Sequence, residues 1–405
     1  MIYQAYQTYV DVMNPIHGIA GSVIATCNRA RCAIGESNSV RRIAAANQLV
    51  ALARLTHKRP AFDIKTVTVG KRETGVTEEV VQRTPFCSLL HFKKDGGTLL
   101  PRVLLVAPLS GHFTTLLRGT VQTLLRDHDV YLTDWHNVRD VPLMQGQFNL
   151  DDFIQHIIQF LETLGAGAHL VAVCQPTVAA LAAAALMAAD NNHAQPATMT
   201  LMAGPMDTRI NPTKVNELAT SKPIEWFERN LIGIVPLRYA GRLRRVYPGF
   251  VQLAAFMSMN LDRHTKSFAD LYHHLSVGDI EKAEPILTFY HEYFAMMDLP
   301  AEFYLQTIAV VFQKHLLPKG KLTYRGHLVE PRAIRRTALL TIEGEKDDIC
   351  AVGQTLAAQD MCSGIRPYMK EHHMQPGVGH YGVFNGRRWD NQIYPHLREF
   401  IHSHE

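Results

Sequence analysis

The chain has 405 residues, of which 47% are hydrophobic and 19% charged, and its formal net charge is +4. This composition is typical of a globular protein with a large core, and it excludes a disordered chain. The charge is too small to indicate a nucleic-acid-binding protein. Six cysteines in a chain of this length do not indicate a disulfide scaffold.

The amino-terminal stretch has neither a basic region nor a long apolar run, so no signal peptide is expected. The longest apolar run, 178–189, is shorter than the roughly 20 residues that span a bilayer. The sequence therefore predicts a cytoplasmic protein without membrane insertion.

Helical spacing of apolar residues predicts helices in residues 1–60, for example through Tyr3, Tyr6 and Val10. Period-two alternation in residues 62–69 and in part of 79–92 then predicts antiparallel strands.

Four short apolar runs follow, separated by stretches long enough for a helix. Buried strands that alternate with helices predict a parallel sheet covered on both faces. The runs are 102–108, 129–135, 169–175 and 198–205.

The next convincing strand, 337–344, begins only after a long segment rich in Phe, Tyr, Leu and Met. A loop of that length without structure is implausible, so an inserted helical lid is expected. The predicted organisation is a helical region (1–60), a core in two parts (61–206 and 336–405) and a lid between them (207–335).

Three polar residues fall where strands of the predicted sheet end. Cys174 follows the third strand of the parallel series, Asp347 follows the strand after the lid, and His380 precedes the last helix. Ligands bind at the carboxyl ends of parallel strands. Nucleophile, acid and histidine also follow each other in the chain order of the α/β-hydrolase triad.

Each residue type suits acyl transfer. A thiolate attacks an acyl carbon, His380 moves the proton, and Asp347 orients the imidazole. The backbone N–H of Gln175 is the expected oxyanion donor, and a second is expected from Leu109 or Ser110.

Other interpretations of these residues stay open. Cys174 alone could be an inert packing residue, and Asp348 competes with Asp347 for the role of the acid. The segment 377–382 matches G-x-G-x-x-G, but too few residues follow it for a dinucleotide-binding unit. No histidine or cysteine spacing predicts a metal site, and no cofactor is expected.

The motifs VAVCQPTVAALAAAALMA, APLSGHFTTLLRGTV, DVYLTDWHNVRDVP, IEGEKDDI and HYGVFNGRRW occur in order along the chain. Together they resemble the intracellular poly(3-hydroxybutyrate) depolymerases, over nearly the whole sequence. The most specific element is an Ala-x-Cys-x-Pro elbow in place of Gly-x-Ser-x-Gly. The resemblance implies an α/β-hydrolase fold and a triad of Cys174, Asp347 and His380.

The function that the resemblance implies is hydrolysis of stored amorphous poly(3-hydroxybutyrate) to monomer and oligomers, at the surface of cytoplasmic granules. An acyl group on a thiol could also pass to coenzyme A as a co-substrate. The alternatives are a polyhydroxyalkanoate-synthase-like acyltransferase and a catalytically inactive granule-coat protein. The sequence leaves open the oligomeric state and the role of the amino-terminal helices in granule contact or dimerisation.

Overall fold

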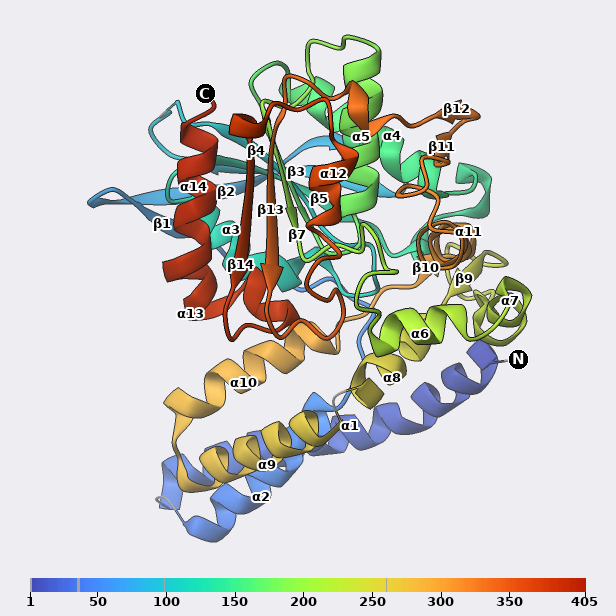
Figure 1. Cartoon of the computed structure of the whole chain (residues 1–405). Coiled ribbons are helices and arrows are strands. Elements are labelled where there is room, and N and C mark those ends of the chain that lie inside the picture. Colours follow the sequence, from blue (N-terminus) through green and yellow to red (C-terminus); the bar gives the residue numbers. More distant parts are fainter. Residues whose placement is uncertain (1, 35–36, 98, 260) are drawn as a thin grey trace.

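The computed structural model describes residues 2–34, 37–97, 99–259 and 261–405. A nine-stranded sheet with the order β1-β2-β3-β5-β4-β6-β7-β13-β14 forms its centre (Figure 1). The strands are β1 (Thr66–Val69), β2 (Arg72–Arg83), β3 (Cys87–Lys94), β4 (Arg102–Val106), β5 (Asp129–Trp135), β6 (His169–Val173), β7 (Thr198–Met202), β13 (Ala338–Gly344) and β14 (Lys370–Gln375).

The sheet has an antiparallel edge and a parallel body. β2 pairs antiparallel with β1 and β3, and β3 pairs antiparallel with β5. From β5 to β14 all neighbouring strands are parallel. The antiparallel strands and the parallel strands predicted from sequence periodicity are therefore confirmed. Because β6, β7 and β13 are buried along their whole length, neither face of these strands is exposed to solvent. Their sequences therefore need no alternation of polar and apolar residues.

Helices cover both faces of the sheet (Figure 1). On one face lie α3 (Arg118–Leu124) and α14 (Tyr394–His402). On the other lie α4 (Leu150–Leu164), α5 (Thr177–Ala189) and α12 (Ala357–Met361). Ten residues of α5 are buried, and its alanines let the helix lie close to the strands.

The segment between β7 and β13 lies over the carboxyl end of the sheet. It contains the helices α6 (Lys214–Thr220), α7 (Ile224–Leu231), α8 (Gly249–Met259), α9 (Leu261–Val277), α10 (Ile280–Tyr293) and α11 (Ala301–Thr307). Its strands are short: β8 (Gly233–Ile234), β9 (Arg245–Tyr247), β10 (Leu299–Pro300), β11 (Thr323–Tyr324) and β12 (His327–Leu328). The four-part domain division, with this segment as a lid, remains a prediction.

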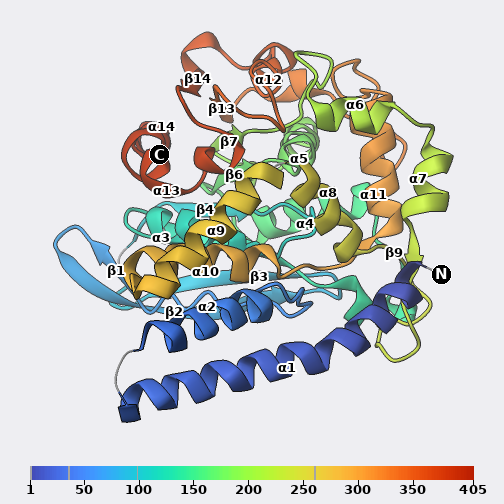
Figure 2. The same ribbon diagram turned by 90° about the horizontal axis from the view of Figure 1, so that it is seen from below.

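The amino-terminal helices α1 (Ile2–Ile34) and α2 (Asn38–Leu52) lie side by side below the sheet (Figure 2). Tyr3 of α1 donates a 2.5 Å hydrogen bond to the buried Asp298, which also accepts from the Gly249 N–H at 2.8 Å. The carboxylate therefore joins α1 to the first residue of α8. Among the described residues, no helix is both long and apolar enough to cross a membrane.

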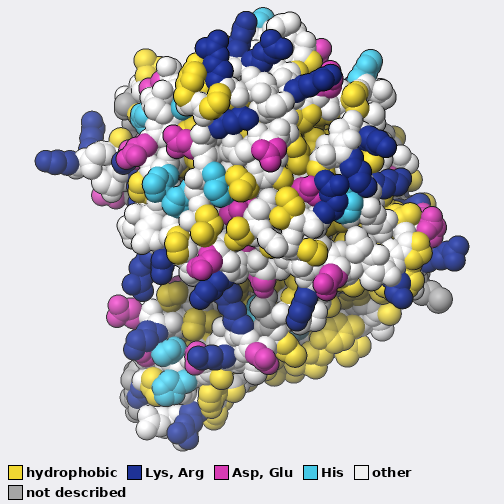
Figure 3. Space-filling model, viewed as in Figure 1, with side chains coloured by type: hydrophobic (Ala, Val, Ile, Leu, Met, Phe, Trp, Pro, Cys, Tyr) yellow, Lys and Arg dark blue, Asp and Glu magenta, His cyan; other side chains and the backbone are white. Residues whose placement is uncertain are grey.

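One face of α1 carries an exposed row of large apolar side chains, which we call the α1 stripe: Ile2, Tyr9, Val12, Ile16 and Ile19. Their spacing places them along one side of the helix. Figure 3 shows a band of hydrophobic side chains over this part of the molecule. Asp11 is the only Asp, Glu, Lys or Arg between residues 2 and 28, and it pairs with Arg238 at 2.9 Å.

Candidate active site

Cys174 occupies a sharp turn between β6 and α5. Its φ of 67° lies in the left-handed region, where a residue other than glycine is strained. The turn is held by a 2.7 Å bond from the Cys174 N–H to the Met202 carbonyl and by a 2.8 Å bond from the Thr177 hydroxyl to the Cys174 carbonyl. This geometry places Cys174 at the carboxyl end of β6, where it lines a cavity, as in a nucleophile elbow.

The glycine that makes room for this turn is not adjacent to the cysteine. Ala172 and Pro176 replace the usual flanking glycines, whereas Gly204 follows the neighbouring strand β7. A Cβ on Gly204 would lie 2.5 Å from the Cβ of Thr177, the first residue of α5. Gly204 therefore supplies the close approach that a crowded elbow needs.

The structure brings Cys174, His380 and Asp347 together. His380 begins a short 3-10 helix, and its Nδ1 lies 2.8 Å from Asp347 Oδ2. His380 and Cys174 line the same cavity, and the proximity of Cys174 contributes to the raised pKa of the imidazole. Asp347 Oδ1 accepts from the N–H groups of Ile349 and Cys350 at 2.9 and 2.8 Å. A carboxylate fixed in this way keeps the Nδ1–H tautomer and leaves Nε2 to receive a proton from sulfur.

A second buried thiol, Cys350, influences the first. The effects of Cys350 and of His380 together outweigh burial and lower the pKa of Cys174 to about 5. Burial opposes the charged form of His380, yet Asp347 and Cys174 raise the pKa of its imidazole well above the usual value. Both shifts favour the thiolate–imidazolium pair over the neutral thiol and imidazole, and the two groups titrate together.

These shifts predict the pH dependence of alkylation at Cys174. Because only the thiolate reacts, labelling by iodoacetamide should be slow below pH 5, rise through about pH 5 and then level off. Cys350→Ala removes the largest lowering cause and should move the midpoint upward. The control is Cys362→Ala, which removes another buried thiol and should leave the midpoint unchanged. A wild-type midpoint near the ordinary cysteine pKa would contradict the ion pair; mass spectrometry of the Cys174 peptide measures it.

An apolar cavity of about 240 Å³ opens above these groups. Its walls come from the loop after β4, from the elbow and from α6, α8 and α11. Cys174 and His380 line it together with Leu218 of α6, Phe256 and Met259 of α8 and Phe312. More than half of the wall is thus supplied by the segment between β7 and β13.

The predicted oxyanion donors lie around the same cavity. Leu109, Ser110 and Gln175 all line it. However, the Leu109 N–H already donates to Oε1 of the Gln175 side chain at 3.2 Å. Because an N–H can only donate, the oxygen of the Gln175 carboxamide, and not its nitrogen, faces the Leu109 N–H. The sequence pattern does not predict this contact.

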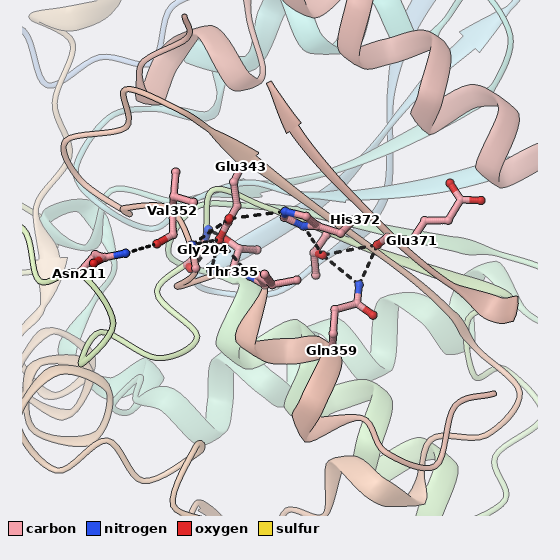
Figure 4. Close-up of polar contacts among 11 residues, drawn as sticks. Gly204, Asn211, Glu343, Val352, Thr355, Gln359, Glu371 and His372 are labelled. Atoms are coloured by element: carbon pink, nitrogen blue, oxygen red, sulfur yellow. Dashed lines mark hydrogen bonds and ion pairs between the residues drawn. The ribbon is translucent and has the colours of Figure 1, made fainter. Parts of the chain in front are cut away.

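A buried carboxylate holds the loop that carries Asp347. Glu343, near the end of β13, accepts from the N–H groups of Gly353, Thr355 and Leu356 at 2.7 to 3.0 Å. Nε2 of His372 lies 3.8 Å from Oε2 of the same carboxylate (Figure 4). The Thr355 hydroxyl accepts from the Gly204 N–H at 2.8 Å, which ties the loop to the glycine beside the elbow. Both halves of the site are therefore fixed to each other.

Sequence reasoning missed Glu343, Cys350 and the side-chain role of Gln175. Only Glu343 has a visible signal, since it is the single charged residue in the apolar run 337–344. Across the described ranges, no group of three or more His, Cys, Asp or Glu side chains is arranged to hold a metal ion.

The strand order and the strained elbow define an α/β-hydrolase. The model of the family described as "PHB de-polymerase C-terminus" matches residues 203–405, half of the chain. The chain belongs to this poly(3-hydroxybutyrate) depolymerase family, and it is a carboxylic ester hydrolase.

Solved structures with a similar fold include three hydrolases. A meta-cleavage product hydrolase from Pseudomonas fluorescens is 15% identical, with a TM-score of 0.42 over 84% of this chain and 98% of that one. A Thermogutta terrifontis esterase is 14% identical (TM-score 0.40, 84% and 98%). A Paleococcus ferrophilus monoacylglycerol lipase is 13% identical (TM-score 0.42, 76% and 96%). A search of curated proteins finds no significant match.

Proposed function

We propose that the protein hydrolyses stored amorphous poly(3-hydroxybutyrate) through an acyl-cysteine intermediate. The observation that carries the proposal is that Cys174 and His380 line one apolar cavity, while Nδ1 of His380 lies 2.8 Å from Asp347 Oδ2. Membership of the depolymerase family supports the polyester as substrate. The proposed place of action is the surface of a cytoplasmic granule.

In the proposed first step, the Cys174 thiolate attacks an ester carbonyl and the oxygen gains negative charge. The Gln175 N–H stabilises this oxyanion, which also replaces Gln175 Oε1 as acceptor of the Leu109 N–H. When the tetrahedral intermediate collapses, the C–O bond breaks, and the alkoxide of the remaining chain takes a proton from His380. The product is a thioester on Cys174.

In the second step His380 takes a proton from the acceptor, whose oxygen or sulfur attacks the thioester. When water is the acceptor, the product is the free acid. When coenzyme A is the co-substrate, the product is 3-hydroxybutyryl-CoA. In both cases Cys174 leaves as a thiolate, which restores the ion pair. The apolar segment 207–335 is proposed to act as a lid that opens toward the water-insoluble substrate.

The test measures 3-hydroxybutyrate released from amorphous protein-coated granules by the wild type and by Cys174→Ala, with and without coenzyme A. Release by the wild type alone supports both the substrate and the nucleophile, and the coenzyme A samples identify the acceptor. If both proteins release it equally, Cys174 is not the nucleophile. If neither does, the inactive granule-coat alternative is favoured.

The α1 stripe is proposed as the surface that contacts the granule. An exposed helix face normally carries charges, whereas this face presents apolar side chains to an uncharged polyester. The double substitution Val12→Lys and Ile19→Lys should lower co-sedimentation with granules by about tenfold or more, because charged groups resist burial. Hydrolysis of a soluble ester should not change.

Ser22→Lys, which adds a charge outside the stripe, is the matched control and should bind granules like the wild type. Gel filtration addresses the other role of this helix. If the wild type is a dimer that the double substitution separates, while granule binding persists, the stripe joins two copies of the chain instead.

A further inference from the structure

Two buried polar atoms, on residues that line the catalytic cavity, have no hydrogen-bond partner. They are Nε2 of His112 and Oε1 of Gln252, and their residues are only 4% and 7% exposed. Both side chains line the same cavity as Cys174. Buried polar groups normally have partners, so an unpartnered pair in a ligand cavity indicates a group that the ligand supplies.

His112 presents Nε2 of a neutral imidazole. Its ring lies between those of Phe256 and Tyr293, with centroid distances of 5.3 and 4.8 Å. Burial lowers the pKa of the imidazole to about 4, against a raising effect of the Tyr293 backbone. In the neutral ring Nε2 either donates or accepts, depending on the tautomer, and a hydroxyl group can partner it in both cases.

Gln252 reaches the cavity from α8. Gly111, with a φ of 110°, follows the predicted oxyanion residues, and a Cβ at that position would overlap the Gln252 carboxamide. The absence of a side chain at Gly111 therefore makes room for the Gln252 carboxamide. Because His112 directly follows Gly111 in the chain, the two polar groups lie beside the loop that also contains Leu109 and Ser110.

The chemistry of the polyester restricts what can donate to the unpartnered acceptor Oε1 of Gln252. Each internal repeat contains a carbonyl oxygen and an ester oxygen, and both are acceptors. The carboxylate end is also an acceptor. The only hydrogen-bond donor in the whole polymer is the free 3-hydroxyl group at the opposite chain end.

We infer that His112 and Gln252 bind the terminal 3-hydroxyl group, whose O–H donates to Oε1 of Gln252 while its oxygen accepts from Nε2–H of His112, so that the cavity receives the hydroxyl end of a polyester chain. The inference rests on the proposed function and extends it to which ester bond is cleaved. With the terminal unit in the cavity, Cys174 attacks the carbonyl of that unit. The thioester then carries one 3-hydroxybutyryl group, and the shortened chain leaves with a new hydroxyl end.

The test compares two soluble trimers of 3-hydroxybutyrate methyl ester, one with a free terminal hydroxyl and one with that hydroxyl acetylated. The wild type should prefer the free trimer in kcat/KM by about tenfold to a hundredfold, the effect of leaving buried polar groups unpaired. Gln252→Met keeps the shape of the side chain and removes its polar atoms, so the preference should fall toward one. His112→Phe keeps the ring and should act in the same direction.

Met259→Leu, another change in the α8 wall of the cavity, is the control and should keep the preference. Equal hydrolysis of both trimers by the wild type overturns the inference, as does a folded Gln252→Met protein with an unchanged preference. A binding measurement separates failure of this inference from failure of the proposed function. Cys174→Ala should bind the free trimer more tightly than the acetylated one even if the wild type hydrolyses neither, and equal affinities overturn the inference.

Discussion

Asp347→Asn should leave the protein folded but lower kcat for a soluble ester by about 10³- to 10⁴-fold. The amide oxygen can still accept from the N–H groups of Ile349 and Cys350, as Oδ1 does now. The amide nitrogen then faces Nδ1 of His380, which must become an acceptor. Its proton moves to Nε2, and the imidazole can no longer take the proton of Cys174.

Asp348→Asn is the matched control, because it removes the same charge one residue further along the chain. It should change kcat by less than tenfold. Thermal unfolding of both variants checks the fold, and alkylation of Cys174 gives a second measurement, since the wrong tautomer also slows thiolate formation. If Asp347→Asn retained most of the wild-type kcat while Asp348→Asn lost it, the assignment of the acid would have to be exchanged.

Gly204→Ala should impair both stability and catalysis. The added methyl group would overlap Thr177, whose branched side chain is buried at the start of α5. Overpacking of a rigid site costs about 1–3 kcal/mol of unfolding free energy. Relief of the overlap displaces the elbow, and a shift of about 1 Å at a nucleophile lowers the rate by about a hundredfold.

Gly18→Ala provides the control, since an added Cβ at Gly18 of α1 meets no neighbouring atom. It should leave kcat unchanged and raise the stability slightly, because alanine favours the helix. Denaturant unfolding and kcat are measured on both variants. A Gly204→Ala protein as stable and as active as Gly18→Ala would show that the elbow tolerates a side chain at position 204.

The parallel sheet and the meeting of Cys174, Asp347 and His380 could be predicted because both follow from local sequence patterns. A buried strand is a short apolar run, and a residue that follows such a run lies at the carboxyl edge of the sheet. The order of the three residues along the chain then matches one known arrangement. No long-range contact had to be inferred to place them at the same edge.

The contacts that complete the site could not be predicted in this way. Cys350 influences Cys174, and Gly204 meets Thr355, across more than a hundred residues of sequence without a shared pattern. The bond between Leu109 and Gln175 uses a side chain whose neighbours are set by packing. His112 is a similar case: in sequence it is one histidine in a loop, and only the folded cavity shows that its Nε2 has no partner.

The unpartnered atoms of His112 and Gln252 have a consequence for a whole granule under the proposed function. A linear polyester has one hydroxyl end per chain, so if the two residues bind this end, the enzyme removes one repeat unit at a time. The mass of the granule then falls while the molar mass of the surviving chains declines only gradually. The initial rate depends on the number of chain ends and not on the amount of polymer. A store built from fewer, longer chains would therefore supply carbon more slowly than an equal mass of short ones.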